Sequence, residues 1–555
     1  MSGSPSESPA WWKEAVFYQI YPRSFADSNG DGIGDLPGIT SKLDYLKELG
    51  LDALWISPIY QSPNDDNGYD ISDYLAIGQE YGTLADFDRL AAGLKVRGLK
   101  VILDQVLNHT SDEHAWFTES RSSRDNQKRD WYHWMDPKGY DAEGRPIPPN
   151  NWKSVFEGSV WEWDAKTEQF YLHLYSRKQP DLNWRNPAVR HALYEVLKTW
   201  AGRGSNGFRL DVINQIAKRE NYADVPPRAG EPGELLLLDA LGCNNPPQAE
   251  YLEEMNCEVF AGADLYAVGE TWFVGPENTL ELTAYDAHRL HGAFYFYFHE
   301  TATGAEHFQR FYELYQKTHG RSWLTVTLGN HDSRRMLSKF GDPERHPFAS
   351  ATLLATWLLT LPATPFLFQG EELGLTDIVF DTIEEYRDIG MLNRYAADVA
   401  AGRSPAEALA EGQATTRDNS RTPMPWSDTP GAGFTSGESW IGIPDSHRSL
   451  NATAAVANPG SVFHAYKKLL ALRKTVKSLV YGDLEALARP GKVLAYRRGA
   501  WEGHPAVCVI LNWSSEPQPW PLVPPTSTPL FANYDELDPS SLRPWEARIY
   551  VESRR

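Results

Sequence analysis

An arginine and an aspartate stand two residues apart in a short apolar segment, residues 207–214. The apolar residues of this segment predict a buried strand: Phe208, Leu210, Val212 and Ile213. In an extended strand Arg209 and Asp211 point to the same side. Two charges inside a buried strand are costly unless they are paired or used. The segment alone leaves two interpretations open: a structural ion pair, or a carboxylate that a guanidinium keeps ionised for catalysis.

Polar residues of the same kinds follow three other predicted strands. Asn108 and His109 follow residues 100–106, Glu270 follows residues 265–269, and His331 and Asp332 come soon after residues 324–328. In a barrel of parallel strands, the carboxyl ends of all strands meet at one rim. Three carboxylates and two histidines at one rim are hard to explain by packing, so the pattern predicts an active site.

Alternating strands and helices would position these residues. Eight short apolar segments are predicted as strands, at residues 16–21, 54–57, 100–106, 207–214, 265–269, 293–297, 324–328 and 364–368. Helices are predicted between them, among others at residues 40–49, 84–97, 187–202, 404–411 and 462–477. Eight such units predict an α/β fold, a (β/α)8 TIM barrel. The short alternating strands beyond residue 481 predict a C-terminal antiparallel β-sandwich domain.

Composition divides the chain into four regions. Residues 1–10 are expected to be a disordered tail, and residues 11–107 and 184–480 the barrel. Residues 108–183 are rich in Trp, Tyr, Pro and Asn without a helical period, which indicates an irregular subdomain inserted after the third strand. Residues 481–555 form the C-terminal β domain. A single hydrophobic core stops growing well below 555 residues, so a chain of this length is expected to form several domains, in agreement with this division.

The residue totals exclude several classes of protein. With 74 acidic and 53 basic residues, the net charge of -21 argues against a nucleic-acid partner. No apolar run predicts a membrane span, and the amino-terminal residues lack the features of a signal peptide. The three cysteines, Cys243, Cys257 and Cys508, form no disulfide or zinc pattern. We therefore expect a cytoplasmic protein, as a monomer or small homo-oligomer.

Tryptophan is abundant, with 20 residues. Core packing explains such a number without any further function. An exposed indole, however, also offers a flat platform for a sugar ring.

Several segments resemble the α-amylase superfamily of glycoside hydrolases (family 13). The segments that match are residues 104–109, 207–214, 268–272 and 330–332, with residues 179–184 in the inserted region. Residues 18–25, 122–126, 369–374 and 417–423 are similar to the oligo-1,6-glucosidase and α-glucosidase branch. The likeness runs from Trp11 to the C-terminus, and it implies the roles given next.

The resemblance implies a retaining mechanism, in which an ionised and a protonated carboxyl group act on one glycosidic bond. Asp211 would be the nucleophile, and Arg209 would keep it ionised by lowering its pKa. Glu270 would be the general acid and then the general base, kept protonated by less polar surroundings that include Trp272. Asp332 would brace the sugar hydroxyls in the transition state.

The resemblance also assigns substrate-binding residues: Tyr69, Asp70, His109, Arg209, His331 and Arg417. Tyr69 would lie against the terminal sugar ring, and Asp70 would bind its far hydroxyls. Arg417 would pair with Asp70 and close the pocket, with Arg421 as the competing candidate. The two histidines would donate hydrogen bonds to the same ring. A pocket closed at the non-reducing end accepts one sugar unit, so the enzyme would be exo-acting.

Oxygen-bearing side chains alternate in a loop after the first strand: Asp27, Asn29, Asp31 and Asp35. Hard oxygen donors in this pattern suit Ca2+ or Mg2+. An EF-hand is excluded because Gly38 stands where it requires glutamate. An Asx-rich turn without metal is the alternative. The resemblance implies one structural Ca2+ (or Mg2+) far from the sugar, with the carbonyl of Ile33 as a further ligand, and no organic cofactor.

The expected function is a retaining exo-acting α-glucosidase that releases terminal glucose from small α-glucosides. Val212 favours α-1,6 (isomaltose-like) linkages, since resembling enzymes tend to have Val there when α-1,6-acting and Ala or Thr when α-1,4-acting. The alternatives are an α-1,4-glucosidase, a sucrose-acting hydrolase, and a transglucosylase or sucrose isomerase. A non-catalytic scaffold, like transporter heavy chains, is disfavoured because the three carboxylates are present. The sequence of residues 221–250 does not indicate a particular substrate.

Overall fold

A barrel of eight parallel strands forms the centre of the molecule. The computed structural model describes residues 9–219, 221–226, 236–237, 247–272, 274–296, 301, 303–522 and 527–552. The strands are β1 (Phe17–Ile20), β2 (Ala53–Ile56), β5 (Lys100–Val106), β12 (Gly207–Asp211), β14 (Tyr266–Thr271), β15 (Gly292–Tyr295), β16 (Leu324–Thr327) and β17 (Ala363–Phe368). Their order in the sheet is β15-β14-β12-β5-β2-β1-β17-β16. The Thr325 hydroxyl of β16 donates to the Ala293 carbonyl of β15, so the two ends of the sheet meet. The predicted barrel is confirmed.

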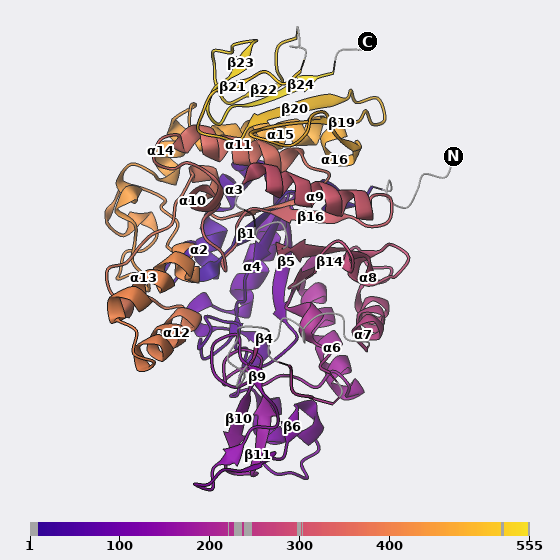
Figure 1. Ribbon diagram of the computed structural model, residues 1–555, viewed down its shortest axis with the longest axis vertical. Coiled ribbons are helices and arrows are strands. Elements are labelled where there is room, and N and C mark those ends of the chain that lie inside the picture. Colours follow the sequence, from indigo (N-terminus) through magenta and orange to yellow (C-terminus); the bar gives the residue numbers. More distant parts are fainter. Residues whose placement is uncertain are drawn as a thin grey trace.

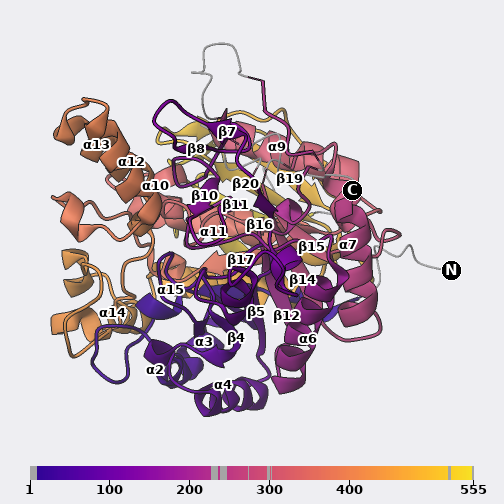
Figure 2. The same ribbon diagram turned by 90° about the horizontal axis from the view of Figure 1, so that it is seen from below.

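Helices surround this barrel (Figure 2). They are α2 (Leu36–Ser41), α3 (Leu43–Leu49), α4 (Leu84–Val96), α6 (Pro187–Arg203), α7 (Pro247–Met255), α8 (Thr279–Thr283), α9 (Gly304–Thr318), α10 (Met336–Phe340) and α11 (Pro347–Thr360). Local signals set their ends: α6 begins at the N-cap Asn186 and ends at Gly204 in a left-handed conformation. The single helix predicted at residues 40–49 is divided into α2 and α3, because Lys42 leaves the helical conformation with ψ 6°.

Aromatic side chains fill the interior of the barrel. The rings of Phe17 and Phe366 stack at 4.5 Å, and those of Trp55 and Phe294 stack at 5.4 Å. Strands covered on both faces in this way are buried along their length, and every residue of β12 is buried, its Arg209 and Asp211 included. The polar residues at the carboxyl ends of the strands therefore lie above a packed floor.

An inserted region extends from the carboxyl ends of the barrel strands, at the far end of the molecule from the C-terminal domain (Figure 1). Between β5 and α6 lie α5 (Ala115–Ser120) and a three-stranded antiparallel sheet of β10 (Trp161–Asp164), β11 (Gln169–Leu172) and β6 (Trp134–Met135). Short pairs accompany it: β7 (Gly139–Tyr140) with β8 (Pro146–Ile147), and β9 (Trp152–Lys153) with β13 (Leu236–Leu237). A hairpin of β3 (Tyr60–Gln61) and β4 (Asp73–Ile77) follows β2.

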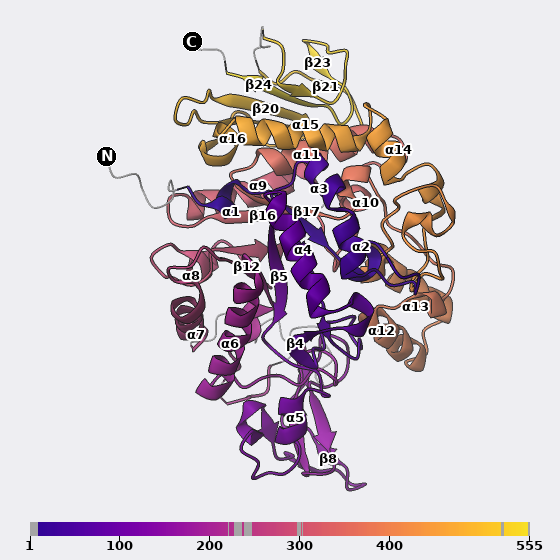
Figure 3. The ribbon, with the colours of Figure 1, turned by 180° about the vertical axis from the view of Figure 1, so that it is seen from behind.

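After β17, the described part of the chain forms five α-helices and an antiparallel C-terminal domain (Figure 3). The helices are α12 (Ile389–Ala400), α13 (Pro405–Thr415), α14 (Ala452–Ala457), α15 (Val462–Thr475) and α16 (Ser478–Tyr481). The main sheet contains β18 (Leu484–Ala486), β19 (Val493–Arg498), β20 (Val507–Asn512), β24 (Ala547–Val551) and β22 (Phe531–Ala532). A second sheet, β21 (Gln518–Pro519) and β23 (Ser541–Leu542), packs on it through Leu542. Two antiparallel layers agree with the predicted sandwich.

Some of the predictions fall on residues outside the described ranges. These are residues 1–8 of the predicted tail, Cys243, Tyr297 of the sixth predicted strand, and most of residues 221–250. Among the helices that the structure does describe, none is long and apolar enough to cross a membrane.

Candidate active site

Three neighbouring strands bring one arginine and three carboxyl groups together at their carboxyl ends. Arg209 Nη1 lies 2.6 Å from Asp211 Oδ1 on the same strand, β12, and 2.8 Å from Asp104 Oδ1 on β5. Its Nη2 lies 2.8 Å from Glu270 Oε2 on β14. All four side chains are buried. Arg209 and Asp211 therefore belong to a cluster of four buried side chains and do not form an isolated structural ion pair.

This cluster holds one guanidinium against three carboxyl groups. Burial raises the pKa of Asp211 well above its ordinary value, Arg209 acts in the opposite direction, and the charges of Glu270 and Asp104 raise the pKa further. Burial also raises the pKa of Asp104, to about 6. The expectation of a lowered pKa for Asp211 is therefore wrong in sign, because desolvation outweighs Arg209. Repulsion among the carboxylates favours a cluster that holds a proton and titrates as a unit.

The backbone turns sharply directly after Asp211. Val212 has φ 37° and ψ 39°, a left-handed conformation that is strained for a β-branched residue. Its amide N–H donates to Glu270 Oε2 at 3.0 Å. The strained turn therefore fixes the carboxyl group of Glu270 relative to that of Asp211.

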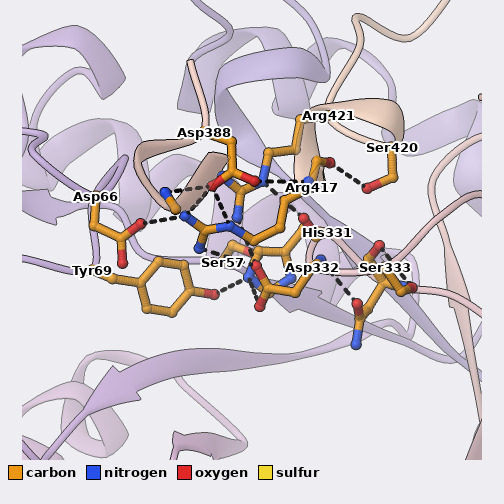
Figure 4. A network of polar contacts seen from close by, with 12 residues as sticks. Ser57, Asp66, Tyr69, His331, Asp332, Ser333, Asp388, Arg417, Ser420 and Arg421 are labelled. Atoms are coloured by element: carbon orange, nitrogen blue, oxygen red, sulfur yellow. Dashed lines mark hydrogen bonds and ion pairs between the residues drawn. The ribbon is translucent and has the colours of Figure 1, made fainter. Parts of the chain in front are cut away.

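Asp332 lies in a second charged group, beyond the end of β16 (Figure 4). Its Oδ1 is 2.6 Å from Arg421 Nη2 and 3.5 Å from Arg417 Nη1, and its Oδ2 is 3.2 Å from His331 Nε2. Burial by itself would raise the pKa of Asp332, but His331 and the two arginines outweigh it and hold the pKa below its ordinary value. Asp332 therefore remains ionised at neutral pH, as an acceptor for hydroxyl groups.

Tyr69 and His331 form a stacked pair beside this carboxylate. Their ring centroids are 5.3 Å apart with an interplanar angle of 10°, and Tyr69 Oη lies 2.5 Å from His331 Nε2. Gln19 Nε2 donates to His331 Nδ1 at 2.7 Å, which places the proton of the neutral ring on Nε2. Burial lowers the pKa of His331 to about 3, so the ring is neutral at working pH.

Two aspartates hold Arg417 in place (Figure 4). Arg417 Nη2 lies 3.1 Å from Asp66 Oδ1 and 2.7 Å from Asp388 Oδ1. The guanidinium carbon also lies 5.0 Å from the ring centroid of Phe156, in the inserted region. Arg421, the competing candidate for this role, binds Asp332 and the carbonyl of His331 instead.

The predicted pair of Arg417 and Asp70 is wrong. The Asp70 carboxylate accepts hydrogen bonds from the Ser62 hydroxyl and from the amides of Asp65 and Asp66, so it stabilises its own loop. It is buried, and the cavity wall that the described residues form does not include it. Asp66, three residues before Tyr69, takes the place that was predicted for Asp70.

His109 lies on another wall of the site. Its Nδ1 is 3.2 Å from Asn108 Nδ2, and its Nε2 is 3.2 Å from Gln179 Nε2. Burial, with a smaller effect of Lys218, lowers the pKa of His109 to about 3. The Lys218 ammonium in turn binds Asn108 Oδ1 at 2.6 Å. The ring is therefore neutral and held by amides.

These groups enclose a cavity of about 590 Å³. Its wall consists of Asp66, Tyr69, His109, Val155, Phe156, Tyr175, Asp211, Val212, Glu270, Trp272, Asp332 and Arg417. Arg209 and His331 support it from behind. A concave site with aromatic walls and a few converging polar groups is typical of small-molecule binding. The chemistry available is proton transfer and nucleophilic attack by carboxyl groups, next to an ionised acceptor for hydroxyls.

The loop predicted to hold a cation is folded around its own carboxylates. Asp27 accepts hydrogen bonds from the amides of Asn29, Gly30 and Gly32, and the Asp35 carboxylate caps α2. Within the described residues, no group of three or more His, Cys, Asp or Glu side chains is arranged to hold a metal ion. Burial raises the pKa of Asp35, and the charge of Asp27 adds a smaller effect in the same direction, so the two carboxylates lie close enough to repel. The donor chemistry thus fits a hard cation.

Sequence reasoning missed several residues of the site. Asp104 stood at a predicted strand end, and Asp66 stood in an acid- and amide-rich run before Tyr69, so both left a signal. Asp388 lies in an irregular region, where no pattern in the sequence indicated it. Phe156 and Tyr175 come from the inserted region, where no periodicity indicated which aromatic rings face the cavity.

Comparisons with known proteins agree with this geometry. Residues 19–482 match the family model "Alpha amylase, catalytic domain". The chain is 44% identical to an oligo-1,6-glucosidase of Parageobacillus thermoglucosidasius, over 97% of this chain and 98% of that protein. It is 43% identical to an α-glucosidase of Pediococcus pentosaceus, with the same coverage. Among solved structures, the isomaltulose synthase of Klebsiella sp. LX3 has a TM-score of 0.92 and 39% identity, with 98% of this chain and 100% of that chain covered. The chain belongs to the α-amylase family of glycoside hydrolases.

Proposed function

We propose that the protein is a retaining, exo-acting α-glucosidase that prefers α-1,6-linked glucose at the non-reducing end of short oligosaccharides. The observation that supports this most is the placement of Asp211 and Glu270 at the two ends of one guanidinium. A shared arginine keeps the two carboxyl groups close, as a retaining mechanism requires. Similarity to oligo-1,6-glucosidases supports the same proposal.

The reaction would proceed in two displacements at the anomeric carbon. With the proton of the carboxyl cluster on Glu270, the Asp211 carboxylate attacks this carbon while Glu270 gives that proton to the departing glycosidic oxygen, so that one C–O bond forms as the other breaks. Glu270, now ionised, then takes a proton from water. The water oxygen attacks the same carbon and releases Asp211 and glucose. Asp332 binds sugar hydroxyls as the oxocarbenium-like charge develops.

The closed end of the cavity supports exo action. The ion pairs of Arg417 with Asp66 and Asp388 join the barrel rim to the irregular segment after β17. A sugar chain cannot pass through such a wall, so only a terminal residue fits. Asp332 and Tyr69 would face that residue, and the glycosidic bond would lie between it and the open side of the cavity.

The linkage preference rests on Val212. Its side chain lines the cavity directly beside Asp211, and its conformation is fixed by the turn. Initial rates on isomaltose and maltose test the preference, in the wild type and in Val212→Ala. We expect isomaltose to be the faster substrate of the wild type and the ratio to move towards maltose in the variant. Faster hydrolysis of maltose by the wild type overturns the proposed preference.

Substitution of the two carboxylates tests the mechanism. We expect Asp211→Asn to lose activity on every α-glucoside by about a thousandfold or more. Glu270→Gln should lose as much on isomaltose but far less on an aryl glucoside whose leaving group needs no proton. Asp44→Asn, at an exposed residue, is the matched control. Near-full activity of either active-site variant on isomaltose contradicts the proposal.

A sucrose isomerase or transglucosylase is the second candidate. Isomaltulose synthase and trehalulose synthase structures superpose on this chain with TM-scores of 0.92 and 0.91. Such enzymes would share the first displacement and differ in which acceptor takes the glucosyl group. Product analysis on concentrated sucrose separates the two: glucose and fructose support hydrolysis, whereas new disaccharides support isomerisation.

We also propose a structural Ca2+ (or Mg2+) in the loop of residues 27–35, with Asp27, Asn29, Asp31 and Asp35 and the carbonyl of Ile33 as ligands. Bound there, a cation would offset the repulsion between Asp27 and Asp35 and would take no part in catalysis. A cytoplasmic location is a further proposal. It is supported by Cys257 and Cys508, which form no disulfide within the part of the chain that the structure describes.

A further inference from the structure

A second cavity, of about 670 Å³, lies at the opposite end of the barrel from the active site. Trp323 and Leu324 at the start of β16 and Pro362 just before β17 contribute to its wall. Asp483 and Trp501, from the C-terminal domain, complete it. The cavity therefore lies at the amino ends of the barrel strands, where the barrel meets the C-terminal domain. No step of the proposed reaction uses it.

Aromatic rings form the walls of this cavity. The rings of Tyr481 and Trp501 stack at 5.0 Å with an interplanar angle of 28°, and Trp323 lies 5.9 Å from Tyr481. Lys13 lies against the same wall, with Nζ 5.1 Å from the ring centroid of Trp323 and 5.2 Å from that of Tyr285. Trp501 is partly exposed, unlike the tryptophans of the barrel core. Its ring thus offers a flat apolar face that is held by a neighbour and open to a ligand.

Polar side chains lie beside these rings. The hydroxyl oxygen of Tyr285 is buried, yet it has no hydrogen-bond partner in the part of the chain that the structure describes. Leaving a buried hydroxyl unpaired is unfavourable, so a ligand that pairs with it gains affinity. Exposed His319 and Asp483 also line the cavity, with His319 Nε2 3.4 Å from Asp483 Oδ1. The cavity therefore combines aromatic faces with both hydrogen-bond donors and acceptors.

We propose that this cavity is a second, non-catalytic binding site for short α-glucosides. The C–H-bearing face of a sugar ring would stack on Trp501, whose indole provides an apolar platform. Its hydroxyls would bind the hydroxyl of Tyr285 and the pair of His319 and Asp483, groups that can both donate and accept. The choice of an α-glucoside, and not another sugar, rests on the function proposed above.

Counting binding sites for isomaltotriose by titration calorimetry tests the proposal. With the inactive Glu270→Gln enzyme we expect two sites per chain. Adding Trp501→Ala should leave one, whereas adding Arg417→Ala should remove the other. Trp163→Ala, at a partly exposed tryptophan of β10, is the control and should leave both. A single site in the Glu270→Gln enzyme that Arg417→Ala removes, or two sites after Trp501→Ala, overturns the proposal. Failure of the proposed function would instead give a single site that Trp501→Ala removes and Arg417→Ala leaves unchanged.

Tyr285→Phe tests the same site without removing a ring. Because the hydroxyl has no partner among the described residues, its loss should not lower the melting temperature, which separates this variant from a damaged fold. The affinity of the second site should fall by roughly three- to tenfold. An affinity unchanged by Tyr285→Phe, with full melting temperature, contradicts the proposed contact and overturns the site.

Discussion

At the scale of the residue, the active site contains two groups of charged side chains with opposite ratios of arginines to carboxyl groups. Arg209 serves three carboxyl groups, which leaves them in mutual repulsion and favours retention of a proton among them. Around Asp332 the balance is opposite, since two arginines hold that carboxylate ionised. One side of the cavity can therefore exchange a proton while the other remains a fixed acceptor. General acid catalysis next to an oxocarbenium-like centre requires this division.

Asp66→Asn tests the corrected pairing of Arg417. The variant removes one of the charges that hold the guanidinium at the closed end of the cavity. We expect KM for isomaltose to rise at least about tenfold, because the terminal sugar loses a preorganised wall. The measurement is steady-state kinetics, with Asp73→Asn, at an exposed residue of β4, as the control. Unchanged KM in Asp66→Asn would show that Arg417 does not depend on this partner.

The residues also show how far sequence could lead. Asp211, Glu270 and Asp332 were predicted because their place at a strand end follows directly from the barrel. Asp70 and Asp66 both stand within a few residues of Tyr69 in one loop, and no periodicity tells which carboxylate turns outward. Only the hydrogen bonds of Asp70 to its own loop decide the matter.

At the scale of the element, β12 is the strand on which the site depends. It lies between β5 and β14, and it supplies the arginine, the proposed nucleophile and the strained turn at Val212. At its start, Gly207 has φ 151°, and a Cβ there would lie 2.1 Å from the Tyr266 carbonyl oxygen. The close approach of β12 and β14 therefore requires glycine.

Gly207→Ala should push β12 away from β14 and lower the free energy of unfolding by about 3 kcal/mol or more. Gly202→Ala, in α6, is the matched control, since nothing lies within 4 Å of its added Cβ. That substitution should stabilise the protein by about 0.5–1 kcal/mol. Chemical denaturation measures both, and equal stabilities of the two variants would contradict this account of β12.

The cap of α5 gives a prediction about pH. His114 accepts from the amide of Trp116, and burial lowers its pKa from 6.5 to about 4. As pH falls from about 6.5 towards 4, His114 binds a proton in the unfolded state but not in the folded state, so stability is lost. His114→Asn keeps a good N-cap but cannot titrate. Between pH 7.5 and 4.5 it should lose about 2–3 kcal/mol less stability than the wild type in denaturant titrations. Equal losses of stability in the wild type and in His114→Asn would contradict this role of His114.

At the scale of the whole molecule, the barrel separates two cavities. The active site lies at the carboxyl ends of the strands beneath the inserted region, and the second cavity lies at their amino ends beside the C-terminal domain. The barrel and the sandwich were predictable, because strand alternation and helix periodicity are local signals. The inserted region was not predictable in detail, because its short strands depend on packing of tryptophans such as Trp152 and Trp161.

The loop of residues 27–35 gives a prediction for the whole fold, since Asp27 also binds the Thr435 hydroxyl far along the chain. Removal of the proposed cation with a chelator should lower the melting temperature of the wild type, and Ca2+ should restore it. In Asp31→Asn the chelator should have a smaller effect or none. If the chelator does not change the melting temperature of the wild type, and elemental analysis finds no metal, the proposed cation is contradicted.

The central claim is that Asp211 carries the glucosyl group between two displacements. Proton NMR during the first minutes of isomaltose hydrolysis tests it directly, by observing which anomer of glucose appears from the non-reducing end before mutarotation. Two displacements predict that α-glucose appears first. Initial formation of β-glucose would mean a single displacement by water, and it would contradict the assignment of Asp211 as the nucleophile.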